Sequence, residues 1–260
     1  MSDVIWKLDR GEGPVVATAI HDGHEVREDV ALLLALDEAS RLREEDPFTG
    51  QWTTIAPTRV IGTRSRFEVD LNRPRETAVY RTPEEAWGLD VWTGILPDDV
   101  VERSLQEYDG FYEGLRNLYT EIAQRHGRFL VLDLHSYNHR REGPDGALAD
   151  PAENPQVNIG TGTMLDRSRC APLIDRFIRD LGSLDFPGGR LDVRENVRFR
   201  GGACAAWAHR TFPEAACVLS IEVKKFFMDE WTGTADEELL RAVGAALGSA
   251  VSGAIEELQR

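Results

Sequence analysis

The sequence predicts an α/β protein with helices on both faces of a mostly parallel sheet, and two observations support this. Short apolar runs typical of buried strands alternate along the chain with longer amphipathic stretches typical of helices. No low-complexity tract or linker divides the 260 residues, which are enough to bury one large core. We therefore expect a three-layer α/β/α arrangement in a single domain over residues 1–260.

The expected elements follow one another along the chain. Each strand is predicted from a short apolar run, and each helix from apolar residues three and four positions apart. Pro97 and two aspartates mark the start of the longest helix. The expected order is strand 15–20, helix 27–45, a helix from Pro97 to Ile122, a strand from Phe129, strand 155–160, helix 167–181, strand 215–223 and helix 237–258. A charged loop over 138–155 is longer than a simple connector and is a candidate lid or pocket wall.

The charge of the chain narrows its partners. A formal net charge of -15 repels phosphate backbones and anionic lipid, so we expect neither nucleic acid nor a membrane surface as a partner. The start of the sequence lacks the pattern of a secretory signal, and no apolar run approaches the ~20 residues of a membrane span. We therefore expect a cytoplasmic protein. Its three widely spaced cysteines are interpreted as core residues.

Three expected strands end in side chains that bind metals. These are His21, His135 and Glu222. Ligands of parallel α/β sheets bind beyond the carboxyl ends of the strands, where these side chains would converge. Histidine and carboxylate are typical zinc ligands in hydrolases, although a single histidine at a strand end is more often structural. Asp133 shares a face with His135 and either orients that imidazole or satisfies nearby backbone.

A dense group of arginines stands out in this acidic chain. The stretch "TRSRFEVDLNRPRE" contains Arg64, Arg66, Arg73 and Arg75. The planar guanidinium binds a carboxylate through paired hydrogen bonds, and the neighbouring amide of Asn72 adds directional donors. The pair Asn72 and Arg73 is therefore suited to hold the anionic end of a small substrate. Pairing with the surplus acids of the chain is the alternative for each arginine.

Five segments together resemble one known family. "IHDG" is similar to the "PHSG" opening of the N-formylglutamate amidohydrolase family, "EEDPF" to its acidic segment, and "SRFEVDLNRP" to its "SRyVvDLNRP" block. "LDLHS" and "SIEVKKFFMDE" resemble its last two blocks. These segments follow the order of the family and span residues 14–230. The resemblance implies the zinc-carboxypeptidase-like fold, also called phosphorylase/hydrolase-like, which the family shares with aspartoacylases.

The resemblance also implies a role for each matching residue. His21, Asp46 and His135 match metal ligands, with Glu45 the alternative to Asp46, and one Zn²⁺ or another divalent metal is expected per chain. Glu222 matches the general base, and Arg66 matches the arginine that polarises the scissile carbonyl. Asn72 and Arg73 match the pair that binds the substrate carboxylate.

Two departures from the family pattern flank the first histidine. Ile20 and Asp22 replace the usual proline and serine, which adds an acid beside the expected metal. His24 and Glu25 follow closely, so a chelate formed by His21 and Glu25 is a further alternative. These changes bear on the substrate rather than on hydrolysis.

The resemblance predicts a metal-dependent amidohydrolase that acts on a small anionic N-acyl amino acid, with N-formyl-L-glutamate the default. The alternatives are an aspartoacylase-like or carboxypeptidase-like hydrolase of another small carboxylated amide, and a catalytically silent carboxylate-binding relative. The sequence leaves the acyl group, the amino acid, the native metal and the oligomeric state open.

Overall fold

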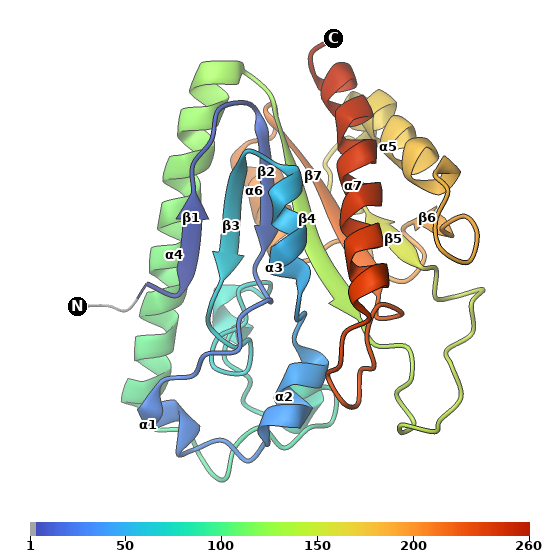
Figure 1. Cartoon of the computed structure of the whole chain (residues 1–260). Helices are drawn as coiled ribbons and strands as arrows, with labels where there is room; N and C mark the ends of the chain where they lie inside the picture. Colours follow the sequence, from blue (N-terminus) through green and yellow to red (C-terminus); the bar gives the residue numbers. More distant parts are fainter. Residues whose placement is uncertain (1–3) are drawn as a thin grey trace.

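Seven strands form one mixed sheet at the centre of the molecule (Figure 1). The computed structural model describes residues 4–260. The strands are β1 (Trp6–Asp9), β2 (Val15–Ala19), β3 (Thr58–Gly62), β4 (Phe129–Tyr137), β5 (Val157–Gly160), β6 (Val193–Glu195) and β7 (Ala216–Lys224). Their order is β1-β3-β2-β4-β7-β5-β6, and the neighbours β3, β2, β4 and β7 are parallel. β1 is antiparallel to β3, β5 is antiparallel to β7, and β6 is parallel to β5.

Helices cover both faces of the sheet and complete the three layers that the sequence predicts (Figure 1). The α-helices are α1 (Glu28–Ala31), α2 (Glu38–Glu44), α3 (Thr49–Trp52), α4 (Asp98–His126), α5 (Ala171–Ser183), α6 (Ala203–Thr211) and α7 (Glu237–Leu258). Short 3-10 helices cover Thr53–Ile55, Arg75–Thr77, Pro83–Ala86 and Arg167–Cys170. α4 and α6 pack on one face, and α3, α5 and α7 pack on the other. Consecutive residues of β2 pack into the hydrophobic cores on opposite faces of the sheet, because side chains alternate along a strand.

The predicted helix over 27–45 is wrong as a single element. The structure has two short helices there, α1 and α2, joined by an extended segment. That segment pairs with a distant part of the chain, since Ala35 N donates to Val91 O at 2.8 Å and Thr93 N donates to Leu33 O at 2.9 Å. Asp37 then caps the start of α2 by accepting from Ser40 N. Long-range pairing thus overrides local helix propensity.

Two of the strands run further than their apolar patterns suggest. β4 continues through Tyr137, so His135 lies inside the strand instead of at its exit. β7 ends at Lys224, just beyond the predicted strand 215–223. The backbone bonds between β4 and β7 continue along this polar stretch and place His135 directly opposite Glu222 in the parallel register. Backbone pairing, rather than an apolar run, sets the ends of these strands.

The last helix, α7, is long and apolar enough to span a membrane by length and composition. Its apolar side chains, among them Leu240, Val243, Leu247 and Val251, are buried in the core shared with α5 and the sheet. This is the environment of a core helix.

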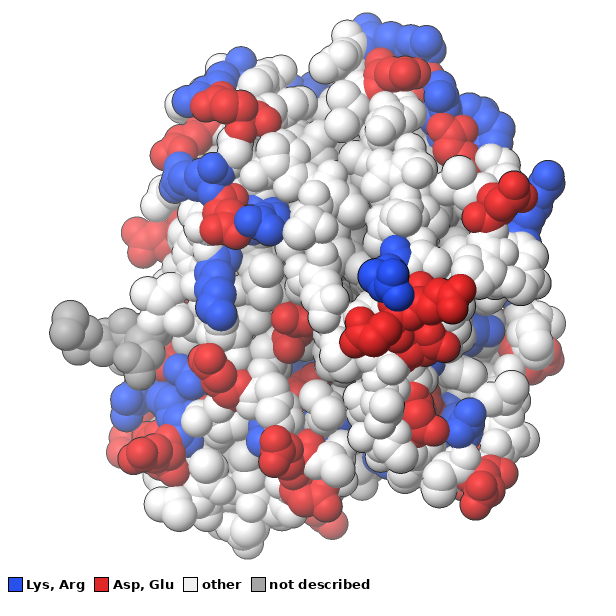
Figure 2. Space-filling model, viewed as in Figure 1, with Lys and Arg blue, Asp and Glu red and all other residues white. Residues whose placement is uncertain are grey.

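Asp236, Glu237 and Glu238 gather at the start of α7, where Figure 2 shows a cluster of acidic side chains. Acidic groups at a helix N-terminus stabilise the helix, because their negative charge interacts favourably with the helix dipole. The three cysteines are buried and unbridged, as predicted.

His209 on α6 predicts how stability depends on pH. Its ring is buried, accepts a hydrogen bond at Nε2 from Val218 N at 3.1 Å, and lies 3.1 Å from Thr163 Oγ1 through Nδ1. Burial lowers the pKa of His209 to about 4. The unfolded chain binds a proton at this residue below pH ~6.5 while the folded chain does not, so stability is lost as pH falls from there towards 4.

Urea unfolding at pH 6.5 and at pH 5 checks this effect. Because His209→Gln removes the proton site, the free energy of unfolding of the wild-type protein should fall by about 1.6 kcal/mol more than that of the variant between these pH values. Equal losses in both proteins would show that His209 does not contribute.

Candidate metal centre and active site

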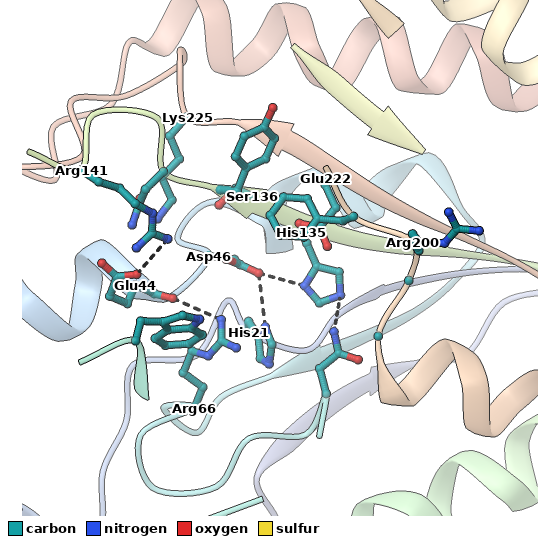
Figure 3. A pocket seen from close by; sticks show the side chains of 17 residues that line it. His21, Glu44, Asp46, Arg66, His135, Ser136, Arg141, Arg200, Glu222 and Lys225 are labelled. Carbon is teal, nitrogen blue, oxygen red and sulfur yellow. Dashed lines mark hydrogen bonds and ion pairs between the residues drawn. The ribbon is translucent and has the colours of Figure 1, made fainter. Parts of the chain in front are cut away.

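A cavity of about 220 Å³ opens at the carboxyl ends of β2, β4 and β7 (Figure 3). Of the polar side chains that the sequence singles out, it contains His21, Asp46, Arg66, Asn72, His135 and Glu222. The lining includes His21, Glu44, Asp46, Arg66, Asn72, Trp87, His135, Asn138, Arg141, Arg200, Glu222 and Lys225. The parallel strands thus place these side chains at one edge of the sheet, as expected for this class of fold.

Three buried side chains form a candidate metal centre. His21 follows β2, Asp46 follows the end of α2, and His135 lies on β4. One ligand atom of each lies within 4.8 Å of the others. Asp46 Oδ2 is 2.9 Å from His135 Nδ1 and 3.4 Å from His21 Nδ1, and Figure 3 shows both rings turned towards this carboxylate.

Two further carboxylates orient the imidazoles from behind. His21 Nε2 donates to Asp70 Oδ1 at 2.7 Å, and His135 Nε2 lies 3.2 Å from Asp133 Oδ2. Thr18 donates to the other oxygen of Asp133 at 2.7 Å, which holds that carboxylate in place. The Nδ1 atoms of both imidazoles therefore remain available to bind a metal in the candidate centre. Histidine ligands of metals almost always donate their second ring nitrogen in this way.

The negative charge of this cluster suits a cation. Burial alone would raise the pKa of Asp46, but hydrogen bonds from His135 and His21 outweigh it and hold that pKa well below its usual value. Burial would lower the pKa of His135, but the charge of Asp133 outweighs it and raises that pKa well above its usual value. Asp46, Asp70 and Asp133 thus concentrate negative charge around two imidazoles. Buried charge of this kind is compensated by partners or metals, so the donor set fits a divalent metal.

Glu45 lies outside this cluster. Its carboxylate accepts from Ser65 Oγ and pairs with His24 Nδ1. Lys225 Nζ donates to the backbone oxygen of Glu45 at 2.7 Å and to that of Arg43 at 2.6 Å, which holds the segment that leads into Asp46. Glu25, the other acid considered near His21, is exposed. The structure therefore brings Asp46, and neither of these glutamates, to the two histidines.

Glu222 lies on β7 beside the candidate metal centre. Its register partner on β4 is His135, and its carboxylate lines the cavity (Figure 3). Burial raises the pKa of Glu222 to about 7. A general base is most effective when its pKa is near the working pH, so this carboxylate is suited to exchange protons with a water in the cavity.

Arg66 and Asn72 line the same cavity from the loop after β3. Arg66 Nη2 pairs with Asp70 Oδ2 at 2.7 Å, its Nη1 donates to Glu44 O at 3.3 Å, and its guanidinium stacks on Trp87. The amide nitrogen of Asn72 lies 3.4 Å from His135 Nε2. A fixed guanidinium and an amide thus flank the candidate metal centre, where they can donate hydrogen bonds to a carbonyl or a carboxylate.

The pattern of the family described as N-formylglutamate amidohydrolase matches residues 13–228, most of the chain. The chain belongs to the N-formylglutamate amidohydrolase family. A search of curated protein sequences finds no significant match.

Two crystal structures show the same fold. The N-formylglutamate amidohydrolase from Ralstonia eutropha JMP134 superposes with a TM-score of 0.74 and 19% identity, covering 97% of this chain and 99% of that chain. A gene product from Agrobacterium tumefaciens superposes with a TM-score of 0.67 and 17% identity, covering 98% and 96% respectively.

Arg73, expected in this family to grip the substrate carboxylate, does not line the cavity. Its Nη2 donates to Glu85 O at 2.5 Å, and its guanidinium stacks on Tyr80. The other two arginines of the basic stretch pair with acids. Arg64 contacts the buried carboxylates of Glu68 and Glu107, and Arg75 binds Asp109 at the surface. Of the four arginines, only Arg66 reaches the cavity.

Two residues that support the candidate site, Asp70 and Lys225, were not predicted from the sequence. Asp70 binds His21 through one oxygen and Arg66 through the other, and Lys225 holds the backbone before Asp46. Asp70 stands in the "DLNR" block, and its position two residues before Asn72 was the available signal. Lys225 offered no signal, because its role depends on two carbonyls distant in sequence.

Proposed function

We propose that this protein is a zinc-dependent hydrolase that cleaves the amide bond of an N-acyl amino acid, with N-formyl-L-glutamate as the first substrate to test. The observation that carries the proposal is the grouping, in one cavity of a family member, of His21, Asp46 and His135 with Glu222 and Arg66. The retention of all five favours catalysis over a silent carboxylate-binding role.

The side chains divide the reaction between them. His21, Asp46 and His135 would hold the zinc ion, which would supply a water with a pKa of about 7 and would polarise the substrate carbonyl. Glu222 accepts the proton of the attacking water and returns it to the departing nitrogen. Arg66, held in place by Asp70, donates hydrogen bonds to the carbonyl oxygen as negative charge develops there.

A specific observation favours the alternative of a larger amide substrate. A second cavity of about 250 Å³ shares Glu44, Trp87, Asn138 and Arg141 with the first. A formyl group is far smaller than this space. A hydrolase of another small carboxylated amide is therefore the second candidate.

Metal analysis and a substrate panel test the proposal. The purified protein should hold about one zinc per chain and release amine from N-acyl amino acids, with a chelator removing both metal and activity. Asp46→Ala should lose the metal, whereas Glu45→Gln should keep it because the Glu45 side chain faces Ser65 and His24. A zinc-loaded enzyme that hydrolyses no member of the panel contradicts the proposed activity. Retention of zinc by Asp46→Ala contradicts the ligand set.

A further inference from the structure

The connection between β4 and β5 is firmly anchored where it enters the cavity. The buried carboxylate of Glu230 accepts from His139 N at 2.8 Å and from Arg140 N at 2.5 Å. The indole of Trp231 donates to Arg140 O at 2.8 Å. The backbone immediately before Arg141 is therefore fixed. Such anchoring of an irregular segment beside an active site is typical of loops that present a functional side chain.

Arg141 is the cationic side chain on this connection that lines the main cavity. Its side chain is 48% exposed, and its Nη2 lies 3.5 Å from Glu44 Oε2. Figure 3 shows the guanidinium directed towards Glu44, on the same side of the centre as Arg66. This single long contact leaves the remaining donors of the guanidinium available to a ligand.

If Arg141 moves away, the carboxylate of Glu44 keeps a second partner. Its other oxygen, Oε1, accepts from Arg43 Nε at 3.2 Å. A buried carboxylate left without any partner would carry a large desolvation cost. Because Arg43 remains, exchange of Arg141 from Glu44 to a substrate carboxylate avoids that cost.

The other cationic groups near the cavity are committed elsewhere. Arg73 lies outside the cavity against Tyr80 and Glu85. Lys225 donates to two backbone carbonyls. Arg200 also lines the cavity, but Figure 3 shows its side chain directed away from His135.

We propose that Arg141 binds a carboxylate of the N-acyl amino acid through paired hydrogen bonds and gives up Glu44 when it does so. This proposal rests on the proposed function and assigns the carboxylate to a residue outside the "DLNR" block. A guanidinium suits this task because its fork matches the two oxygens of a carboxylate.

The test compares Arg141→Ala with Arg103→Ala, a control of equal charge change on α4 whose guanidinium contacts Asp29 at the surface. Each is assayed on N-formyl-L-glutamate, on N-formyl-L-glutamine and on the α-amide of N-formyl-L-glutamate. We expect Arg141→Ala to raise KM for N-formyl-L-glutamate about 10-fold to 100-fold with kcat nearly unchanged. Arg103→Ala should resemble the wild-type protein, and Arg141→Lys should be intermediate.

The two amide substrates identify the carboxylate. The KM effect of Arg141→Ala should vanish on the substrate that lacks the carboxylate bound by Arg141. An equal effect on all three substrates, or none on N-formyl-L-glutamate, overturns the proposal. If the wild-type enzyme hydrolyses none of them, the proposed function fails separately. Calorimetric titration with L-glutamate then tests Arg141 alone, since equal binding by wild type and Arg141→Ala overturns its role.

Discussion

Replacing Glu222 by glutamine is expected to reduce kcat by about 10²-fold to 10⁴-fold, the usual contribution of a general base. Glutamine keeps the shape of the side chain but cannot accept the proton of the attacking water. Metal content and the circular dichroism spectrum should stay as in the wild-type protein. Glu214→Gln, at a carboxylate 81% exposed, is the matched control and should keep full activity. Near-normal turnover in Glu222→Gln would exclude this residue as the base.

The dependence of kcat/KM on pH provides a second test of Glu222. Glu222 acts as a base only when ionised, so kcat/KM should fall as pH drops through its pKa. Burial raises that pKa to about 7, and a cation at the neighbouring centre would lower it again by favouring the carboxylate. The residual activity of Glu222→Gln should lack this acid limb.

Replacing Asp70 by asparagine is expected to weaken metal binding and activity by about 10-fold to 100-fold, as found when partners of metal-binding histidines are removed. Asp70 accepts from His21 with Oδ1 and from Arg66 with Oδ2. An asparagine has one oxygen, so its NH₂ group must face either the imidazole N–H or the guanidinium. Competition with a chromogenic chelator measures the metal affinity, and steady-state kinetics measure kcat/KM.

Asp133→Asn provides the comparison for Asp70→Asn. Asp133 contacts His135, but Arg66 pairs with Asp70. We expect Asp133→Asn to lower metal affinity, whereas Asp70→Asn should also lower kcat when metal is saturating. Unchanged metal affinity in Asp70→Asn would contradict the bridging role of this carboxylate.

Local patterns were sufficient for much of the fold. The apolar runs of β2 and β7 and the periodicity of α4 and α7 are properties of neighbouring residues, and the structure confirms these elements. The predicted helix over 27–45 failed because the segment between α1 and α2 pairs with residues 91–93, which no local pattern reports. The edge strands β1 and β6 have only 4 and 3 residues, which is too short for a strand to be predicted, although β1 alternates between half-buried and exposed side chains.

The site shows the same division. His21, His135 and Glu222 could be predicted to converge because parallel strands expose their carboxyl ends at one edge. Asp46 came only from the family resemblance, since its place depends on the end of α2 and on Lys225. The family resemblance matched Arg73, with Asn72, to the pair that binds the substrate carboxylate. In the structure the side chain of Arg73 contacts Tyr80 and Glu85, which no local pattern reports, and it does not line the cavity.

The register of β4 and β7 has a consequence for how this scaffold can change. His135 and Glu222 are direct neighbours across two hydrogen-bonded strands, so about 4.8 Å of interstrand spacing separates the proposed metal ligand from the proposed base. Ordinary sheet geometry maintains that spacing, whatever the surrounding connections do. Arg141, by contrast, lies on the connection after β4, outside the sheet. Insertions or exchanges there could give the scaffold new substrates during evolution while the reaction itself is inherited unchanged.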